Sequence, residues 1–326
     1  MDGLVIGGTQ FIGPRTVEEL LAHDYDVTIF TRGNRENPFA DRASVTHHQG
    51  DRTDRSDLAD ARDAVDPDVV IDLVAYHPAD VREAVDRFAD VDAYVFVSSA
   101  AAYRVPTIPV IEGETPLLEC TDEQATDDSF ETYGNRKAEC DRIVFDAAER
   151  GVDAVSVRPC VVYGPGDHTE RLDYWIHRVL VQERVLVPGD GTNVMHRGYV
   201  DDVASALRLA AEAGEPGQAY NVGDRSAVTL GRTIQRIADA ADTDVDLVYA
   251  SERELGDEAS LEDFPLYNPS PFVVDTDTLA GLGWESTPMR ESMAETVAEH
   301  RESDRDGHDH GPDHDTEAAI LDRLAG

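Results

Sequence analysis

A chain of 326 residues can bury one large core or two smaller ones. Apolar residues make up 41% of it and charged residues 29%, as in other globular proteins, but Asp and Glu outnumber Lys and Arg by 67 to 28. The net charge of −39 repels phosphate backbones and anionic membrane surfaces, so we expect neither nucleic acid nor membrane as a partner.

The carboxylates are spread along the whole chain. We interpret them as a solvated acidic surface suited to a high-salt cytoplasm, where cations screen the self-repulsion. The first predicted strand begins almost at Met1, which leaves no room for a signal peptide, and no apolar run approaches the roughly 20 residues that span a bilayer. Cys120, Cys140 and Cys160 form no CxxC motif, so we expect reduced thiols and a cytoplasmic location.

Apolar runs alternate with amphipathic segments along the first half of the chain. The pattern predicts strands at 3–8, 26–30, 69–74, 93–99 and 153–159, and helices at 11–23, 80–89 and 129–151. The strands lack polar alternation, as expected when helices cover both faces of a parallel sheet. Strands that alternate with helices predict an α/β fold with a doubly wound parallel sheet of the Rossmann type, mainly within residues 1–165.

The second half, 166–301, is more mixed. It predicts helices at 175–181, 200–213, 229–241, 277–283 and 289–301, and strands at 218–223 and 245–250. We expect a smaller substrate lobe here, with returns of the chain to the sheet. Residues 302–326 form an acidic, His-containing tail that we expect to be disordered in part.

Three histidines of this tail, His308, His310 and His314, lie among aspartates. Together they could hold a divalent cation. A solvated tail explains the same composition, and we predict no metal site.

A glycine turn joins the first predicted strand to the first predicted helix. Early glycines permit a tight turn, Gly13 lets the helix lie close to the sheet, and the helix N-terminus offers N–H groups to a pyrophosphate. The alternative is a glycine turn without a ligand. We predict a dinucleotide site that comprises Gly7, Gly8, Thr9, Gln10, Phe11, Ile12 and Gly13.

The end of the second strand carries no carboxylate. An NAD-preferring fold usually places Asp or Glu there to hold the ribose hydroxyls, whereas this chain has Thr31 and Arg32. An arginine can pair with a 2′-phosphate in a bidentate way, so we expect NADP in preference to NAD, with a solvent-exposed arginine as the alternative. Asp51 and Arg52 end the third strand, where a side chain commonly reaches the adenine.

Of the 28 Lys and Arg residues, only Lys137 is a lysine. It stands four residues after Tyr133 in a predicted helix, so the two side chains face the same way. A nearby ammonium favours the phenolate and lowers the pKa of a phenol, which is ordinarily about 10. At the end of a strand, Ser99 is our candidate for the hydroxyl that polarises a substrate carbonyl, and Ser98 is the reserve. A serine that merely ends a strand is the alternative.

These residues together resemble the extended, NAD-dependent epimerase/dehydratase form of the short-chain dehydrogenase/reductase superfamily, over residues 3–300. Arg158 and Pro159, followed by VYGPGD at 162–167, look like the RPxxVYGPxD stretch of that family. HRGYVDDVASAL at 196–207 is similar to another of its segments, and the GGxxxxG turn resembles an atypical subgroup. Ala100 and Ala101 stand where sugar 4,6-dehydratases carry Asp and Glu, which argues against dehydration.

The resemblance implies an NAD(P)-dependent oxidoreductase or epimerase that acts on a hydroxyl or keto carbon, with a nucleotide sugar as the default substrate. Tyr133 would exchange the proton, Ser99 would bond the same oxygen, and Lys137 would tune Tyr133 and hold the nicotinamide ribose. Pro159 would lie under the nicotinamide.

Further substrate contacts follow from the same resemblance. Arg158, His196 and Arg197 are candidate contacts of the diphosphate, with structural ion pairs as the alternative. The resemblance also allows a homodimer. A catalytically weak NADP sensor or an RNA-associated scaffold on the same fold is the alternative function.

Overall fold

The computed structural model describes residues 1–104 and 107–325, and the chain divides into two compact units. Unit 1 consists of Met1–Cys160, Val200–Gly223 and Val274–Ser286. Unit 2 consists of Val161–Tyr199, Asp224–Val273 and Thr287–Gly326. Each unit is therefore assembled from segments that are distant in the sequence.

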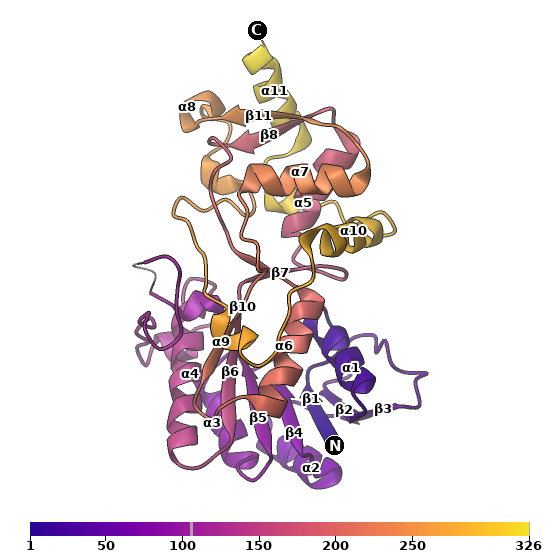
Figure 1. Ribbon diagram of the computed structural model, residues 1–326, viewed down its shortest axis with the longest axis vertical. Coiled ribbons are helices and arrows are strands. Elements are labelled where there is room, and N and C mark those ends of the chain that lie inside the picture. The colour runs from indigo at the N-terminus through magenta and orange to yellow at the C-terminus, as the bar shows by residue number, and fades with distance from the viewer. Residues whose placement is uncertain (105–106, 326) are drawn as a thin grey trace. The chain divides into compact units, whose positions relative to one another are not determined.

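A seven-stranded parallel sheet forms the centre of unit 1, in the order β10-β6-β5-β4-β1-β2-β3 (Figure 1). Its strands are β1 (Asp2–Ile6), β2 (Asp26–Thr31), β3 (Val45–Gln49), β4 (Val69–Asp72), β5 (Ala93–Val97), β6 (Ala154–Pro159) and β10 (Ala219–Val222). The predicted α/β fold with a doubly wound parallel sheet is confirmed. β10 is one of the predicted returns from the second half of the chain.

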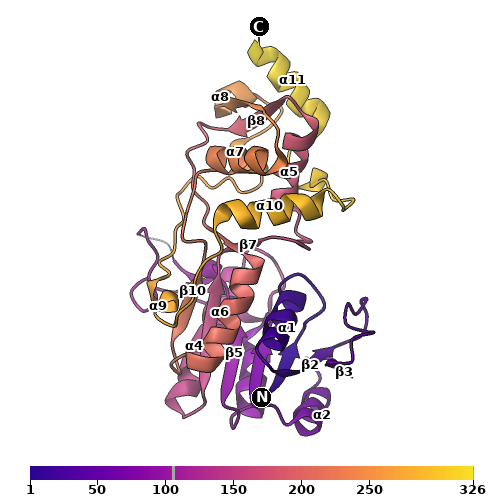
Figure 2. The same cartoon turned by 45° about the vertical axis from the view of Figure 1, so that its right-hand side comes forward.

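Helices cover both faces of this sheet. α1 (Ile12–Ala22) packs beside α6 (Val200–Ala213), as Figure 2 shows, and α3 (Pro78–Arg87) packs beside α4 (Tyr133–Glu149) on the opposite face. The remaining elements of unit 1 are α2 (Arg55–Val65), α9 (Asp277–Ala280) and the 3-10 helices η1 (Ala100–Ala102) and η2 (Gln124–Thr126).

The position of a strand in the sheet explains its composition. β5, with the sequence AYVFV, is buried at every residue because helices lie on both of its faces. β3, with the sequence VTHHQ, is the edge strand and is largely exposed. Apolar runs therefore mark the centre of the sheet clearly and its edge poorly.

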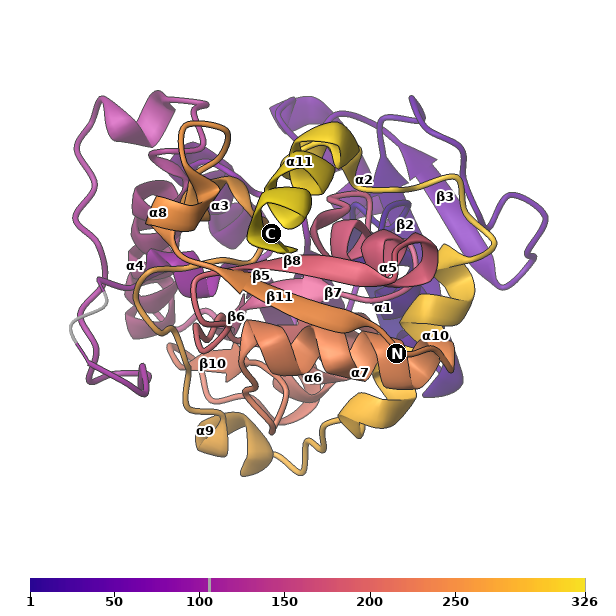
Figure 3. The same cartoon turned by 90° about the horizontal axis from the view of Figure 1, so that it is seen from above.

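Unit 2 contains two small parallel sheets. β7 (Val161–Tyr163) pairs with β9 (Arg197–Tyr199), and β8 (Arg184–Pro188) pairs with β11 (Asp246–Ala250), as Figure 3 shows for the second pair. Its helices are α5 (Arg171–Val181), α7 (Leu230–Ala241), α8 (Glu252–Leu255), α10 (Met289–His300), α11 (His314–Ala325) and the 3-10 helices η3 (Leu261–Asp263) and η4 (His308–His310). α7 packs against both α5 and α10.

The end of the chain differs from the predicted tail. Residues His314–Ala325 form α11 rather than a disordered segment, because Glu317, Ile320 and Leu321 are buried. The Glu317 carboxylate accepts hydrogen bonds from the Tyr174 hydroxyl and from Nε of Arg178, both in α5. The polar composition predicted disorder because it does not show that one of these carboxylates enters a buried ion pair.

The helices and the cysteines bear on the expected absence of membrane spans and on the expected reduced thiols. Within residues 1–104 and 107–325, no helix combines the length and the apolar character that crossing a membrane requires. Cys120, Cys140 and Cys160 are free thiols, and the last two are buried.

Candidate active site

The glycine turn packs closely against itself at the start of α1. A Cβ on Gly13 would lie 2.6 Å from Cα of Gly8, and a Cβ on Gly8 would lie 2.8 Å from Cγ2 of Ile29 in β2. Gly8 also has a φ of +96°, which favours glycine. Glycine at these two positions therefore lets the first turn of α1 approach the sheet, as a cradle for a pyrophosphate requires.

A cavity of about 610 Å³ opens beside this turn, entirely within unit 1. A volume of this size is ordinary for a site that binds a cofactor or a small molecule. Its walls come from the glycine turn, the ends of β2 and β3, the loop after β4 and the start of α4. Of the predicted site residues, those that line it are Gly7, Thr9, Gln10, Thr31, Arg32, Asp51, Arg52 and Tyr133.

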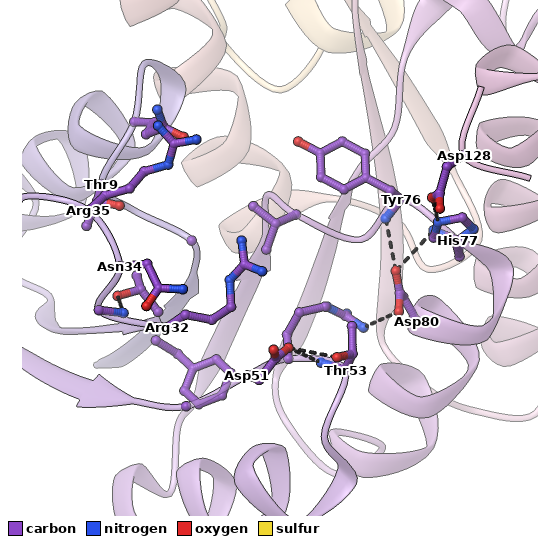
Figure 4. A pocket seen from close by; sticks show the side chains of 18 of the residues that line it. Thr9, Arg32, Asn34, Arg35, Asp51, Thr53, Tyr76, His77, Asp80 and Asp128 are labelled. Atoms are coloured by element: carbon purple, nitrogen blue, oxygen red, sulfur yellow. Dashed lines mark hydrogen bonds and ion pairs between the residues drawn. The ribbon is translucent and has the colours of Figure 1, made fainter. Parts of the chain in front are cut away.

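Two arginines occupy the side of the cavity that follows β2. Arg32 and Arg35 lie on the same side in Figure 4, and both are exposed. In the described part of the chain neither forms an ion pair with a carboxylate, although acidic residues are abundant. Nearby, Asp51 accepts hydrogen bonds from the backbone N–H and the hydroxyl of Thr53, and these bonds lower the pKa of Asp51. The charge of Arg32 adds to this lowering. Because Arg32 and Arg35 both line the cavity and form no ion pair in the described part of the chain, this side can receive an anionic group.

Arg52 lies against the floor of the same cavity. It is buried and pairs with Asp72 and with Asp80, where Nη1 and Oδ1 are 3.2 Å apart. The other oxygen of Asp80 accepts the backbone N–H groups of Tyr76 and His77. The guanidinium therefore braces the loop after β4, and its charge is already matched.

Tyr133 and Lys137 lie near each other on α4, as their spacing predicted. Nζ of Lys137 is 5.8 Å from the centre of the Tyr133 ring. Lys137 is 2% exposed, and Nζ donates hydrogen bonds of 2.8 Å to the carbonyl oxygens of Ala75 and Val97. Burial lowers the pKa of Lys137. The ammonium is therefore held by backbone carbonyls near the ends of β4 and β5.

Aromatic rings complete the surroundings of this ammonium. The ring centre of Phe96 lies 4.7 Å from Nζ of Lys137, and that of Tyr76 lies 5.2 Å away. The faces of aromatic rings attract cations and partly replace the water that burial removes. The sequence marks the lysine but none of these partners.

The side of the cavity near Tyr133 also contains residues that sequence analysis missed. Nε2 of His77 lies 2.9 Å from Oδ1 of Asp128, which joins the loop after β4 to the segment that leads into α4 (Figure 4). Phe130 is 84% exposed and stacks on Tyr133, with ring centres 6.2 Å apart and ring planes at 6°. An exposed phenylalanine in a cavity wall provides an apolar surface for a ligand.

The serines adjoin η1. Oγ of Ser99 accepts a hydrogen bond of 3.1 Å from the backbone N–H of Ala101, whereas Ser98 is buried and its Oγ has no hydrogen-bond partner within the described ranges. A Cβ on Gly134 would collide with the carbonyl oxygen of Ala101, so this glycine lets α4 approach η1. The signal for it was a glycine inside a helical pattern, directly after Tyr133. The role of Ser99 stays a prediction.

Arg158 makes structural contacts in β6. It is 2% exposed, its Nε donates to Asp141 at 2.8 Å, and its Nη1 donates to the Tyr103 hydroxyl at 2.6 Å. These contacts correspond to the ion pair that the sequence left as the alternative to a diphosphate contact. Pro159 is the last residue of β6.

His196 and Arg197 belong to unit 2, and both are buried. Nε2 of His196 lies 2.7 Å from the carbonyl oxygen of Asp224, and burial lowers the pKa of His196. Arg197 donates hydrogen bonds to the Thr233 hydroxyl and to the Met195 carbonyl. Their predicted diphosphate contacts stay a prediction.

The histidines near the end of the chain were the candidate metal ligands. His308 contacts Asp306 and Asp309. Across residues 1–104 and 107–325, no three His, Cys, Asp or Glu side chains gather in a way that could hold a metal ion.

Known proteins resemble this chain over most of its length. Chloroplast stem-loop binding protein of 41 kDa b from Arabidopsis thaliana is 25% identical over 295 residues, which cover 86% of this chain and 74% of that protein. Low-salt glycan biosynthesis protein Agl12 from Haloferax volcanii is 26% identical over 314 residues, which cover 87% of this chain and 93% of that protein. dTDP-glucose 4,6-dehydratase from Bacillus anthracis, solved in complex with NAD, shares the fold with a TM-score of 0.74 at 19% identity, over 93% of this chain and 97% of that one.

The model of one protein family, described as the NAD dependent epimerase/dehydratase family, matches residues 3–88 and 77–223. The matched residues include the glycine turn, the cavity walls and the start of α4 with Tyr133 and Lys137. The resemblance inferred from sequence motifs is thereby confirmed. This chain belongs to the NAD dependent epimerase/dehydratase family.

Proposed function

We propose that the protein is an NAD(P)-dependent oxidoreductase or epimerase that acts on a hydroxyl or keto carbon of a nucleotide sugar. The observation that carries this proposal is that one cavity is lined by both the glycine turn and Tyr133, with the Lys137 ammonium 5.8 Å from the Tyr133 ring. A dinucleotide fits these residues, since the glycines allow the close approach that a pyrophosphate needs. The nucleotide-sugar class is supported by the relative Agl12, because the name of that protein refers to glycan biosynthesis.

The residues of the chain have separate tasks in this proposal. The turn Gly7–Gly13 holds the pyrophosphate at the N-terminus of α1. Tyr133 takes the proton of the substrate hydroxyl, or returns one to a substrate carbonyl, and the Lys137 ammonium favours the phenolate form that the first step requires. Ser99 donates a hydrogen bond to the same substrate oxygen. The bound dinucleotide supplies the redox chemistry.

Reduction or epimerisation is proposed in preference to 4,6-dehydration. A dehydration needs an acid and a base beside the sugar, and the two positions after Ser99 are Ala100 and Ala101 of η1. Neither side chain can exchange a proton.

We also propose NADP as the preferred cofactor. Arg32 and Arg35 support it, because they line the cavity after β2 without a carboxylate partner among the described residues. The NAD-bound dehydratase shares only the fold at 19% identity and does not carry the preference either way. Fluorescence titration with NADPH and NADH tests it, and tighter binding of NADH would contradict it.

Replacement of Tyr133 by Phe tests the catalytic proposal. The variant should bind NADPH as the wild type does but lose about 10²- to 10⁴-fold in kcat, the usual contribution of a positioned acid or base. Nucleotide sugars that shift the thermal midpoint of the cofactor-loaded protein provide the assay substrates. A variant that turns over at the wild-type rate refutes the catalytic role.

A second candidate is a catalytically weak NADP sensor or RNA-associated scaffold. The name of the stem-loop binding relative favours it, whereas the net charge of −39 opposes RNA binding. Filter binding of an RNA stem-loop at low salt distinguishes the enzyme from the RNA-associated scaffold. If the protein is the enzyme, we expect it to retain no RNA on the filter.

A further inference from the structure

Arg136 is a buried cation in the wall of the cavity, one residue before Lys137. It is 4% exposed, and its Nη2 donates to the carbonyl oxygen of Ser129 at 2.8 Å. Nη1 lies 3.5 Å from the carbonyl oxygen of Tyr76, at the limit of a hydrogen bond, and Nε has no partner in the described part of the chain. A guanidinium has five N–H donors, so most of its donor capacity is left over.

No carboxylate forms an ion pair with Arg136 within residues 1–104 and 107–325. The Asp127 carboxylate accepts hydrogen bonds from the hydroxyls of Ser129 and Thr132, which lower its pKa, and the charge of Arg136 adds to this lowering, but Asp127 makes no ion pair with the guanidinium. A buried charge without a counter-charge is costly to the folded state. The surplus of acidic residues in this chain makes the missing partner a specific feature of this position.

Of the four other buried arginines in the described part of the chain, three pair with a carboxylate, and Arg197 donates to the Thr233 hydroxyl and the Met195 carbonyl. Arg52 pairs with Asp72, Arg158 pairs with Asp141, and Arg178 pairs with Glu317. Each of those three is buried and has its acidic partner within its own unit. Arg136 departs from this pattern, and it lines a cavity in which an anion of a ligand can supply the missing charge.

The position of Arg136 in the cavity indicates which part of a bound ligand it would contact. It contacts the backbone of Tyr76, which lies with His77 and Asp128 on the side of the cavity away from Arg32 and Arg35 (Figure 4). It also follows Tyr133 by three residues, one turn along α4. An anion bound there belongs to the molecule whose oxygen faces Tyr133, rather than to the phosphates near the glycine turn.

We propose that Arg136 binds a carboxylate carried by the substrate, so that the nucleotide sugar is a uronic acid rather than a neutral hexose. This inference rests on the proposed function. The planar fork of a guanidinium matches the two oxygens of a carboxylate. Phe130, stacked on Tyr133, provides an apolar surface for the C–H face of the same sugar ring.

Calorimetry on NADP-loaded protein with UDP-glucuronate and UDP-glucose tests the proposal. Wild type should bind UDP-glucuronate about 10- to 100-fold more tightly, the range expected for a charged hydrogen bond. Arg136→Gln should abolish this difference and leave the affinity for UDP-glucose unchanged. Arg136→Lys keeps the charge but not the fork and should retain part of the preference.

A matched control lies on the same helix. Arg142 also donates to a backbone carbonyl, that of Leu118, but it pairs with Glu139 and does not line the cavity. Arg142→Gln should keep the full preference for UDP-glucuronate. The preference of the wild type should also persist at molar KCl, because a buried pair is screened far less than an exposed one.

Three outcomes would overturn the proposal. Wild type that binds both sugars equally contradicts it, and so does Arg136→Gln that weakens both equally, which indicates a structural role. If neither nucleotide sugar binds, the proposed substrate class is wrong, and D-glucuronate and D-glucose then test Arg136 alone. Saturable binding of D-glucuronate that Arg136→Gln abolishes supports the carboxylate site, whereas no binding of D-glucuronate to the wild type overturns it.

Discussion

The two sides of the cavity present their cations differently. Arg32 and Arg35 stand on the exposed loop after β2, where water solvates them and their side chains can adjust to a ligand. Arg136 and Lys137 are consecutive residues of α4, almost completely buried, and backbone carbonyls fix their positions. Substitutions on the loop should therefore change the affinity for the cofactor, whereas substitutions on α4 should change the chemistry or the choice of substrate.

The largest effect is expected at Lys137. Lys137→Met should lower kcat by about 10²- to 10⁴-fold at neutral pH, because the Tyr133 phenol loses the ammonium that favours its ionised form. Steady-state kinetics measure this loss. In a Tyr133→Phe background the same change should cost little more, since the two residues act as a unit. Fully additive losses would show that Lys137 acts independently of Tyr133.

The same variant has a pH signature in stability. Burial lowers the pKa of folded Lys137, whereas an unfolded lysine has a pKa of about 10.4. The cost of burying the charge is complete below the folded pKa and is relieved as pH rises from that value to the unfolded one. The free energy of unfolding of the wild type should therefore rise relative to that of Lys137→Met in this window. Denaturant unfolding at a series of alkaline pH values checks this, and a constant difference would contradict it.

A substitution that separates α4 from η1 should have the next largest effect. Gly134→Ala places a methyl group against the Ala101 carbonyl and should destabilise the fold by about 1–3 kcal/mol, with a fall in kcat as Tyr133 moves. Gly3→Ala is the control, because its Cβ would lie 3.4 Å from Tyr25, an ordinary contact. Equal thermal midpoints for the two variants would show that α4 has room to move.

A smaller effect is expected on the loop side. Arg32→Gln and Arg35→Gln should each raise the Kd for NADP by about tenfold, the equivalent of about 1.4 kcal/mol, and leave the Kd for NAD and kcat at saturation unchanged. Fluorescence titrations with both reduced cofactors measure this. A parallel loss for NAD would place the arginines on the shared diphosphate instead of a 2′-phosphate.

The smallest effect on stability per residue is expected from the carboxylates of the acidic surface rather than from the cavity. With a net charge of −39, added KCl should screen the repulsion and raise the thermal midpoint. A midpoint that stays constant or falls in rising KCl would contradict the interpretation of the surface as an adaptation to high salt.

Much of the fold could be predicted because burial leaves a clear trace in composition. The run AYVFV identifies β5, whereas VTHHQ of the edge strand β3 gives almost no apolar signal. The end of the chain was expected to be disordered in part, whereas His314–Ala325 form α11. Its polar composition hides the few buried positions, Glu317 among them, that dock α11.

The site could be predicted where its residues follow a strand or share a helix. The spacing of Tyr133 and Lys137 places them together, since α4 brings every fourth residue to one side. The partners of Lys137 are carbonyl oxygens 62 and 40 residues away, and a carbonyl is present in every residue, so no pattern marks them. For the same reason, composition alone does not show that Arg136 is buried without an ion pair to a carboxylate in the described part of the chain.

The docking of α11 has a practical consequence for anyone who handles the protein. Its composition invites removal of the segment after Arg301 as a dispensable tail. Such a deletion would take away Glu317 and leave Arg178, whose guanidinium lies 3.7 Å above the Tyr174 ring, as an unmatched charge inside unit 2. Loss of one partner from a buried pair costs about 3–5 kcal/mol. Precipitation of a shortened protein would therefore be explained by the loss of the Glu317 carboxylate. Experiments on binding or turnover should keep residues 302–326.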